Sequence, residues 1–190
     1  MIRAFIAVQI APKTLQRILE AIGQLKLRVP DIRWIPPSNL HVTLKFLGDI
    51  DAAKVDPIAQ ALQRNLHPFS RFIISAKGLG VFPDVKRPRV LWVGLHGNRL
   101  AALASTVETA LQLLGFPPEK RGFTPHLTVG RWRQSDKSPT KLGEELGKWQ
   151  SQEFGETEVR DVILFQSLLK SDGAIHRPLK NVALCDEPLN

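Results

Sequence analysis

A four-residue pattern, His-x-Thr followed by an aliphatic residue, occurs twice and constrains the fold of this chain more than any other feature. The first copy, HVTL, spans residues 41–44, and the second, HLTV, spans residues 126–129. Polar and apolar residues alternate in both copies, which is typical of a strand with one buried face. Two such strands in one chain predict a duplicated half-site, with one contribution from each half of the chain.

The alternation assigns the side chains of each copy to two faces. His41 and Thr43 share one face of the first strand, and His126 and Thr128 share one face of the second. Residues two apart on a strand are separated by about 6.6 Å, so both polar groups of a strand can reach one small anion. Lys45 falls on the face of His41, where a solvated strand lysine is expected. The opposite face takes the apolar residues, which are Leu40, Val42, Leu44 and Phe46 in the first copy and Leu127 and Val129 in the second.

Three stretches carry apolar residues at helical spacing, and strand-like runs separate them. The helical stretches lie at residues 12–25, 51–66 and 98–114, and the strand-like runs at 3–10, 32–35, 40–47, 69–82, 89–95, 124–132, 158–166 and 175–185. Helices interspersed with several strands on short loops are typical of an α+β fold with antiparallel sheets. Residues 134–149 are rich in Ser, Lys and Gly, which predicts an exposed loop with at most a short helix.

The order strand, helix, H-x-T strand in the first part of the chain recurs around residues 89–132. This weak symmetry predicts a single bilobal domain over residues 1–190. Two pseudo-symmetric lobes would face each other across a central cleft, with one motif on each side of it and the helices on the outside.

The net charge and the cysteine content limit which partners and which cellular compartment are expected. The chain has 26 Lys+Arg against 18 Asp+Glu, a net charge of +8 and a pI of about 10.0. This favours a polyanionic partner such as RNA, although a well-solvated basic surface is an alternative. The only cysteine, Cys185, excludes an internal disulfide and favours a reducing, cytoplasmic compartment. No segment has the length of a membrane span, so no membrane partner is expected.

Longer segments around the motifs resemble the RNA 2′,3′-cyclic phosphodiesterases, a family of the two-histidine phosphoesterase superfamily whose members are also called 2′-5′ RNA ligases. The similar segments are RAFIAV at residues 3–8, WIPPSNLHVTLKFLG at 34–48, RVLWVGL at 89–95 and FTPHLTVGR at 123–131. The resemblance implies hydrolysis of a 2′,3′-cyclic phosphate to a 2′-phosphate without a metal or other cofactor. It also implies RNA ends, such as those of tRNA fragments, or cyclic nucleotides as substrates of a monomeric enzyme.

Carried over to this sequence, the resemblance makes His41 and His126 the catalytic pair. It makes Thr43 and Thr128 the hydroxyls that bind the phosphate. Histidine suits general acid and base catalysis because its ordinary pKa of about 6.5 lets one ring be neutral while the other is protonated. The residues themselves do not say which ring does which task. The resemblance favours His41 as the acid to the leaving 3′-oxygen and His126 as the base to water.

Two further positions match substrate-binding residues of the family. Arg131 matches a residue used near the nucleotide, but its odd offset from His126 places it on the opposite face of a regular strand. A bulge or the strand end near Gly130 would turn it back. Phe5 matches an aromatic residue that stacks on a base, and a core strand residue is an equal alternative. The remaining histidines, His67, His96 and His176, lack a threonine two residues on and are expected to be structural.

Other readings of the same residues stay open. The four motif residues also suit a phosphodiesterase for small cyclic nucleotides or ADP-ribose cyclic phosphate. A non-catalytic RNA-binding module would use them only to hold phosphate, and 2′-5′ ligation would be a secondary, reverse activity. Serine hydrolases, zinc proteases and dinucleotide-binding proteins lack support, because the chain contains no G-x-S-x-G, H-E-x-x-H or G-x-G-x-x-G.

Overall fold

The computed structural model describes residues 1–29, 31–133, 142–170 and 173–186. Its elements follow the order β1 (Ile2–Val8), α1 (Pro12–Lys26), β2 (Arg33–Trp34), β3 (Val42–Ile50), α2 (Val55–Leu66), β4 (Phe72–Phe82), β5 (Val90–His96), α3 (Asn98–Gln112), β6 (His126–Arg131), α4 (Leu142–Gly147), β7 (Glu153–Val159), β8 (Asp161–Lys170) and β9 (Gly173–Ala183). The predicted α+β class is confirmed. Of the predicted loop at 134–149, residues 134–141 lie outside the described residues, and α4 is the short helix allowed there.

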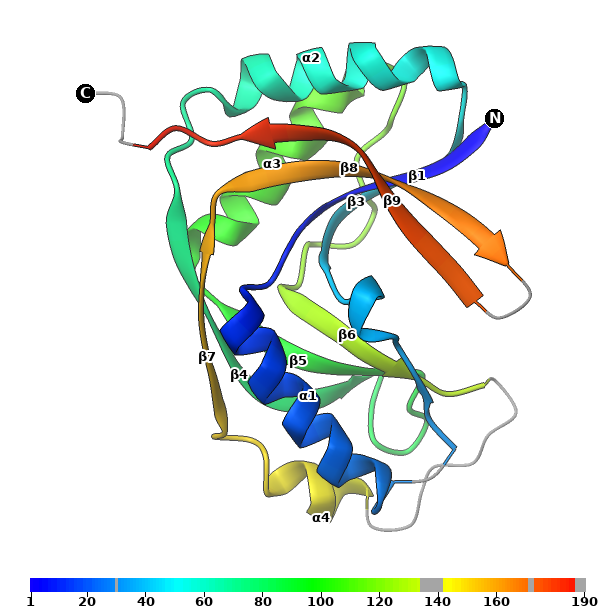
Figure 1. The fold of residues 1–190 in the computed structure, drawn as a ribbon, viewed down its shortest axis with the longest axis vertical. Coiled ribbons are helices and arrows are strands. Elements are labelled where there is room, and N and C mark those ends of the chain that lie inside the picture. Colours follow the sequence, from blue (N-terminus) through cyan, green and yellow to red (C-terminus); the bar gives the residue numbers. More distant parts are fainter. Residues whose placement is uncertain (30, 134–141, 171–172, 187–190) are drawn as a thin grey trace.

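The strands form two antiparallel sheets, and each sheet contains one H-x-T strand (Figure 1). Sheet A has the order β3-β1-β8-β9, with β3 at its edge, and sheet B has the order β2-β6-β5-β4-β7. The order β6-β5-β4 pairs strands that follow one another along the chain, whereas β8 crosses back to pair with β1. The two copies of the motif are therefore held by two different sheets.

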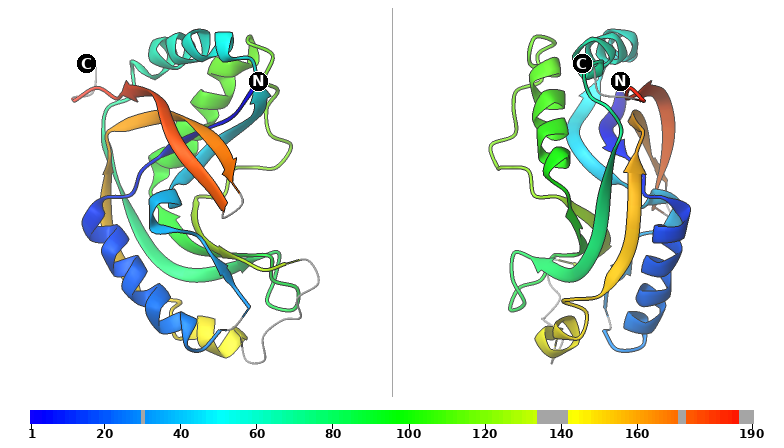
Figure 2. Two further views of the ribbon diagram at one scale, coloured as in Figure 1. Left: turned by 45° about the vertical axis from the view of Figure 1, so that its right-hand side comes forward. Right: turned by 90° about the vertical axis from the view of Figure 1, so that its left-hand side faces the viewer.

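The helices pack on the outside of these sheets, as Figure 2 shows from two sides. Helix α2 contacts α3 and β9, α3 contacts β3, and α1 contacts β7. The predicted stripes supply the contacts, since Ile18, Ile22 and Leu25 of α1 are buried. Burying an aliphatic side chain of this size contributes about 1.5–3 kcal/mol. No helix among the described residues is long and apolar enough to span a membrane.

The predicted strand-like run at 158–166 is extended except at Arg160, but it belongs to two strands in different sheets and not to one. Strand β7 pairs with β4 in sheet B, and β8 pairs with β1 in sheet A, with only Arg160 between the two strands. The chain thus passes from one sheet to the other within a continuous extended run, which Figure 1 shows in gold and orange. This connection ties the two sheets together.

Candidate active site

A β-bulge follows Thr43 in the first H-x-T strand and changes which face each later residue occupies. Thr43 pairs with Ala7 of β1, but Lys45 pairs with the adjacent Ile6, so Leu44 is the extra residue. A bulge of this kind shifts the alternation by one position. Ala7 belongs to the face of sheet A that carries a small apolar cluster of Phe5, Ala7, Ile163 and Phe165, whereas Ile6 belongs to the main core. We call the face of Ala7 and Thr43 the motif face of sheet A.

The bulge overturns the two predictions made for the residues after it. Lys45, expected on the solvated face with His41, is turned toward α3 and is only 2% exposed. Phe46, expected in the core, pairs with Phe5 on the motif face and is 61% exposed. Simple alternation fails here because the partner strand, not the sequence of β3, sets the register.

The second H-x-T strand contains a bulge at the equivalent position. Thr128 pairs with Trp92 of β5, but Gly130 pairs with the adjacent Leu91, so Val129 is the extra residue. Arg131 then pairs with Val90, two residues from Trp92, and therefore lies on the face of Thr128, the motif face of sheet B. The predicted return of Arg131 to the motif face near Gly130 is confirmed.

His41 lies in a tight aromatic setting just before β3. Its ring stacks on Phe5 with 4.6 Å between centroids, and the ring of His176 meets it edge-on at 4.9 Å. The approach to His41 is fixed by a one-turn 3₁₀ helix at Pro37–Asn39, in which the Asn39 amide donates to the Ala174 carbonyl of β9 at 2.6 Å. The imidazole is therefore held between β1 and β9.

This setting lowers the pKa of His41 from its ordinary 6.5 to about 4. Burial is the largest cause, and the charges of His176 and Arg131 lower the pKa further, against a backbone hydrogen bond at Asn39 that raises it. Burial lowers the pKa because a charged imidazolium loses hydration in the interior. His41 is therefore neutral in the free protein at pH 7.

His126 has a different environment in sheet B. Its Nδ1 lies 2.7 Å from the Thr124 carbonyl oxygen, and the Phe82 ring meets it edge-on at 5.2 Å. A carbonyl only accepts hydrogen bonds, so Nδ1 carries a proton and Nε2 is the nitrogen left to exchange a proton with a substrate. This hydrogen bond fixes the ring in one orientation.

The two H-x-T strands lie against each other although they belong to different sheets. Strands β3 and β6 contact each other, and the Arg131 guanidinium of β6 is close enough to His41 to lower its pKa. Thr43 and Thr128 are both half-buried on their motif faces. Arg131 of the second motif strand is thus within electrostatic reach of the histidine of the first motif.

Phe5 occupies the position of a core residue. Phe5 is 3% exposed, and its ring packs against the rings of His41, His176 and Phe165, with 4.6, 4.8 and 5.3 Å between centroids. Neither face of the ring is open to a nucleobase. Of the two readings from the sequence, the structure favours the core residue, which here supports the His41 ring.

The site includes a third histidine that sequence reasoning assigned to a structural role. His176 of β9 pairs with Ser167 and lies against both Phe5 and His41. Its Nδ1 is buried and has no hydrogen-bond partner among the described residues, and burial lowers its pKa. No pattern around residue 176 indicates this position, since it depends on β9 lying two strands away from β1.

Within the described ranges, no three His, Cys, Asp or Glu side chains lie close enough together to hold one metal ion. The donors that surround the motifs are imidazoles, hydroxyls and a guanidinium, which suit proton transfer and anion binding.

Known proteins are similar to this chain in both sequence and fold. The family model described as LigT like phosphoesterase matches residues 8–92 and 94–176. The RNA 2′,3′-cyclic phosphodiesterase of Aquifex aeolicus is 38% identical over 180 residues, 93% of this chain and 94% of its own length. The enzyme of the same name from Archaeoglobus fulgidus is 36% identical, with 94% and 98% covered.

Two solved structures show the same arrangement of strands and helices. A protein of Thermus thermophilus superposes with a TM-score of 0.79 at 26% identity, covering 96% of this chain and 97% of its own. Escherichia coli LigT, solved in complex with 3′-AMP, is similar in fold with a TM-score of 0.76 at 24% identity, covering 96% and 98%.

Proposed function

Because the chain belongs to the LigT-like phosphoesterase family, we propose that it hydrolyses the 2′,3′-cyclic phosphate at RNA ends to a 2′-phosphate. The observation that supports this proposal is the contact between the two H-x-T strands, which brings Arg131 of β6 close enough to His41 to lower its pKa. One copy of the chain supplies both motifs, so a monomer with a single bilobal phosphoesterase domain is sufficient. Its RNA substrates would be cytoplasmic.

The reaction needs one proton removed and one supplied. A base takes a proton from water as the water oxygen attacks phosphorus, and the bond from phosphorus to the 3′-oxygen breaks as an acid gives its proton to that oxygen. Thr43 and Thr128 donate hydrogen bonds to the non-bridging oxygens, where negative charge grows, and Arg131 adds a positive charge. His41 and His126 carry the two proton transfers.

The lowered pKa of His41 favours His41 as the base and His126 as the acid. With a pKa of about 4, His41 is protonated in on the order of one molecule in a thousand at pH 7. At pH 7 such a group is almost always in the neutral form that a base requires, and it seldom has a proton to give. This assignment reverses the one that the family resemblance favours, which makes it a separate question for experiment.

The activity is tested by identifying the product. Purified protein is incubated, with EDTA present, with RNA ending in a 2′,3′-cyclic phosphate, with cyclic mononucleotides and with ADP-ribose cyclic phosphate. We expect a 2′-phosphate on RNA. Preference for ADP-ribose cyclic phosphate would favour the small-molecule alternative, and RNA bound but left uncut would favour the binding module. Recovery of activity only with added metal would contradict the acid–base scheme.

The assignment of the two histidines is tested with a substrate whose 3′-oxygen is replaced by sulfur. A thiolate leaves without being protonated, so the acid is not needed. We expect the sulfur substrate to restore much of the activity of His126→Ala and little of that of His41→Ala. The opposite pattern would make His41 the acid.

A further inference from the structure

A surface hollow of about 540 Å³ lies along the outer edge of β3. On one side it is lined by the strand itself, and on the other by the segment that connects α3 to β6. The lining residues are Lys45, Phe46, Leu47 and Gly48 from β3 and Phe116, Pro117, Pro118, Glu119, Lys120 and Arg121 from the connecting segment. We call this hollow the β3 groove.

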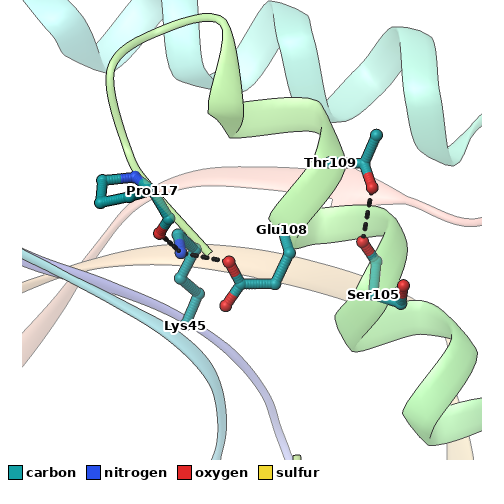
Figure 3. Close-up of polar contacts among 5 residues, drawn as sticks. All are labelled: Lys45, Ser105, Glu108, Thr109 and Pro117. Carbon is teal, nitrogen blue, oxygen red and sulfur yellow. Dashed lines mark hydrogen bonds and ion pairs between the residues drawn. The ribbon is translucent and has the colours of Figure 1, made fainter. Parts of the chain in front are cut away.

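The far wall of the β3 groove is held in place by the lysine that the bulge turns inward. Lys45 forms a buried ion pair with Glu108 of α3 and donates a hydrogen bond to the Pro117 carbonyl at 2.8 Å, as Figure 3 shows. Lys54 supports the same segment, with its Nζ 3.3 Å from the Leu114 carbonyl and over the Phe116 ring. The groove therefore has a fixed wall.

Phe46, in the lining of the groove, lies close to the surroundings of His41. The Phe46 ring lies 6.3 Å from Phe5, and Phe5 in turn stacks on His41. Phe46 is 61% exposed, unlike Phe5, so its ring is available for stacking. An exposed aromatic ring next to a polar site offers a surface on which a nucleobase can stack.

Positive charge lines the far wall. Lys120 and Arg121 are exposed, and neither forms an ion pair within the part of the chain that the structure describes. Glu119 is the one carboxylate in the groove lining. An exposed aromatic residue and unpaired cations in the lining of one hollow are the combination that binds single-stranded nucleic acid, with bases stacked on rings and phosphates on cations.

We propose that the β3 groove binds the RNA strand immediately 5′ of the nucleotide that carries the cyclic phosphate. A base of that strand stacks on Phe46, and its phosphates pair with Lys120 and Arg121. The proposal rests on the proposed function for the identity of the strand. With this groove the protein acts on RNA chains with a higher kcat/KM than on free cyclic nucleotides.

The first test compares a cyclic mononucleotide with an oligomer of the same terminal nucleotide. Phe46→Leu should lower the ratio of kcat/KM on the oligomer to that on the mononucleotide by roughly 5- to 150-fold, the range for loss of one base stack. Phe46→Tyr, which keeps a ring, should retain the ratio. Leu27→Ala, at another exposed apolar residue, serves as the control. An equal loss on both substrates, or no loss, would overturn the proposal.

The second test follows binding of an RNA oligomer with an ordinary 3′-hydroxyl by fluorescence anisotropy. The plot of log affinity against log salt should become shallower by about 1.4 in Lys120→Gln/Arg121→Gln, for two lost phosphate contacts. Lys13→Gln/Arg17→Gln removes the same charge from α1 and should leave the slope unchanged. If both double variants changed the slope equally, the effect would come from overall charge, and the proposal that the groove binds RNA would be wrong.

Because this oligomer has no cyclic phosphate, its binding does not depend on catalysis. Wild-type protein that binds the oligomer through Phe46, Lys120 and Arg121 yet hydrolyses no cyclic phosphate would retain the groove and overturn the proposed function. Wild-type protein that hydrolyses both substrates equally well, with no effect of substitutions in the groove, would retain the proposed function and overturn the groove as an RNA site. Equal binding of polyglutamate, with the same dependence on Phe46, would make the groove a site for acidic polypeptides and overturn the RNA assignment.

Discussion

The two H-x-T strands, β3 and β6, have the same backbone irregularity but carry different side chains around it. Both contain a bulge directly after the threonine, which turns one residue inward and the next outward. In β3 the inward residue is Lys45, which holds the segment after α3, and the outward residue is Phe46. In β6 the inward residue is Gly130, where an added Cβ would lie 2.5 Å from Ile32 Cγ2, and the outward residue is Arg131.

The two histidines differ in the same way. His41 is enclosed by rings, and its pKa is lowered to about 4, whereas His126 is oriented by one hydrogen bond to a carbonyl. A duplicated backbone motif thus supplies symmetric positions, and the neighbouring residues make the two positions chemically unequal. Two proton transfers in opposite directions need such inequality.

The largest effect is expected from removing either histidine. His41→Ala and His126→Ala should each lower kcat on cyclic-phosphate RNA by about 10²–10⁴-fold, because each removes a proton-transfer group. Steady-state kinetics with circular dichroism to verify folding would measure this. A folded variant with near wild-type turnover would show that its histidine transfers no proton in the reaction, and that the two strands do not contribute equally to catalysis.

The inward positions should respond differently to mutation. Lys45→Met leaves Glu108 without its partner and should lower the free energy of unfolding by about 3 kcal/mol, the lower end for a broken buried ion pair, since Glu108 is partly exposed. Gly130→Ala requires Ile32 to move and should cost about 1–3 kcal/mol, the usual cost of overpacking. Urea denaturation would measure both.

The double variant Lys45→Met/Glu108→Gln sharpens this prediction. It removes the unpaired charge, so it should recover part of the stability lost in Lys45→Met. A double variant no more stable than the single one would show that Lys45 contributes through its bond to Pro117 and not through the ion pair.

The threonines should behave alike, because both occupy the same position before a bulge. Thr43→Ala and Thr128→Ala should each lower kcat/KM by about 10–10³-fold, as expected for one hydrogen-bond donor to a developing negative charge. Comparison of the two variants on one substrate would measure this. If one threonine proves neutral, the phosphate lies nearer to one strand than to the other.

The smallest effect is expected from His176→Gln, measured by the pH dependence of kcat/KM. If His41 acts as a base, activity falls as pH drops through its pKa of about 4. The charge of His176 lowers that pKa, so its removal should move this limb to higher pH. The limb should stay below 6.5, because burial, the largest cause, remains. An unmoved limb would show that His176 only packs against His41.

Much of the site could be read from the sequence because its signals are local. Alternation within six residues placed Thr43, His126 and Thr128 on strands and His41 directly before one, and helical spacing placed α1, α2 and α3. The odd offset of Arg131 from His126 conflicted with the family resemblance, and a bulge or the strand end near Gly130 was the expected way to reconcile the two. These inferences hold because strand and helix periods act over a few neighbouring residues.

The rest depended on partners far away in the chain. The sequence by itself determined two H-x-T strands in an α+β fold with a basic surface. Only the tertiary structure decided that Lys45 is buried, that Phe46 is exposed beside it, and that His176 lies against His41. The physical reason is that the register of β3 is set by β1 and the place of β9 by β8, and no local pattern encodes a pairing between distant strands.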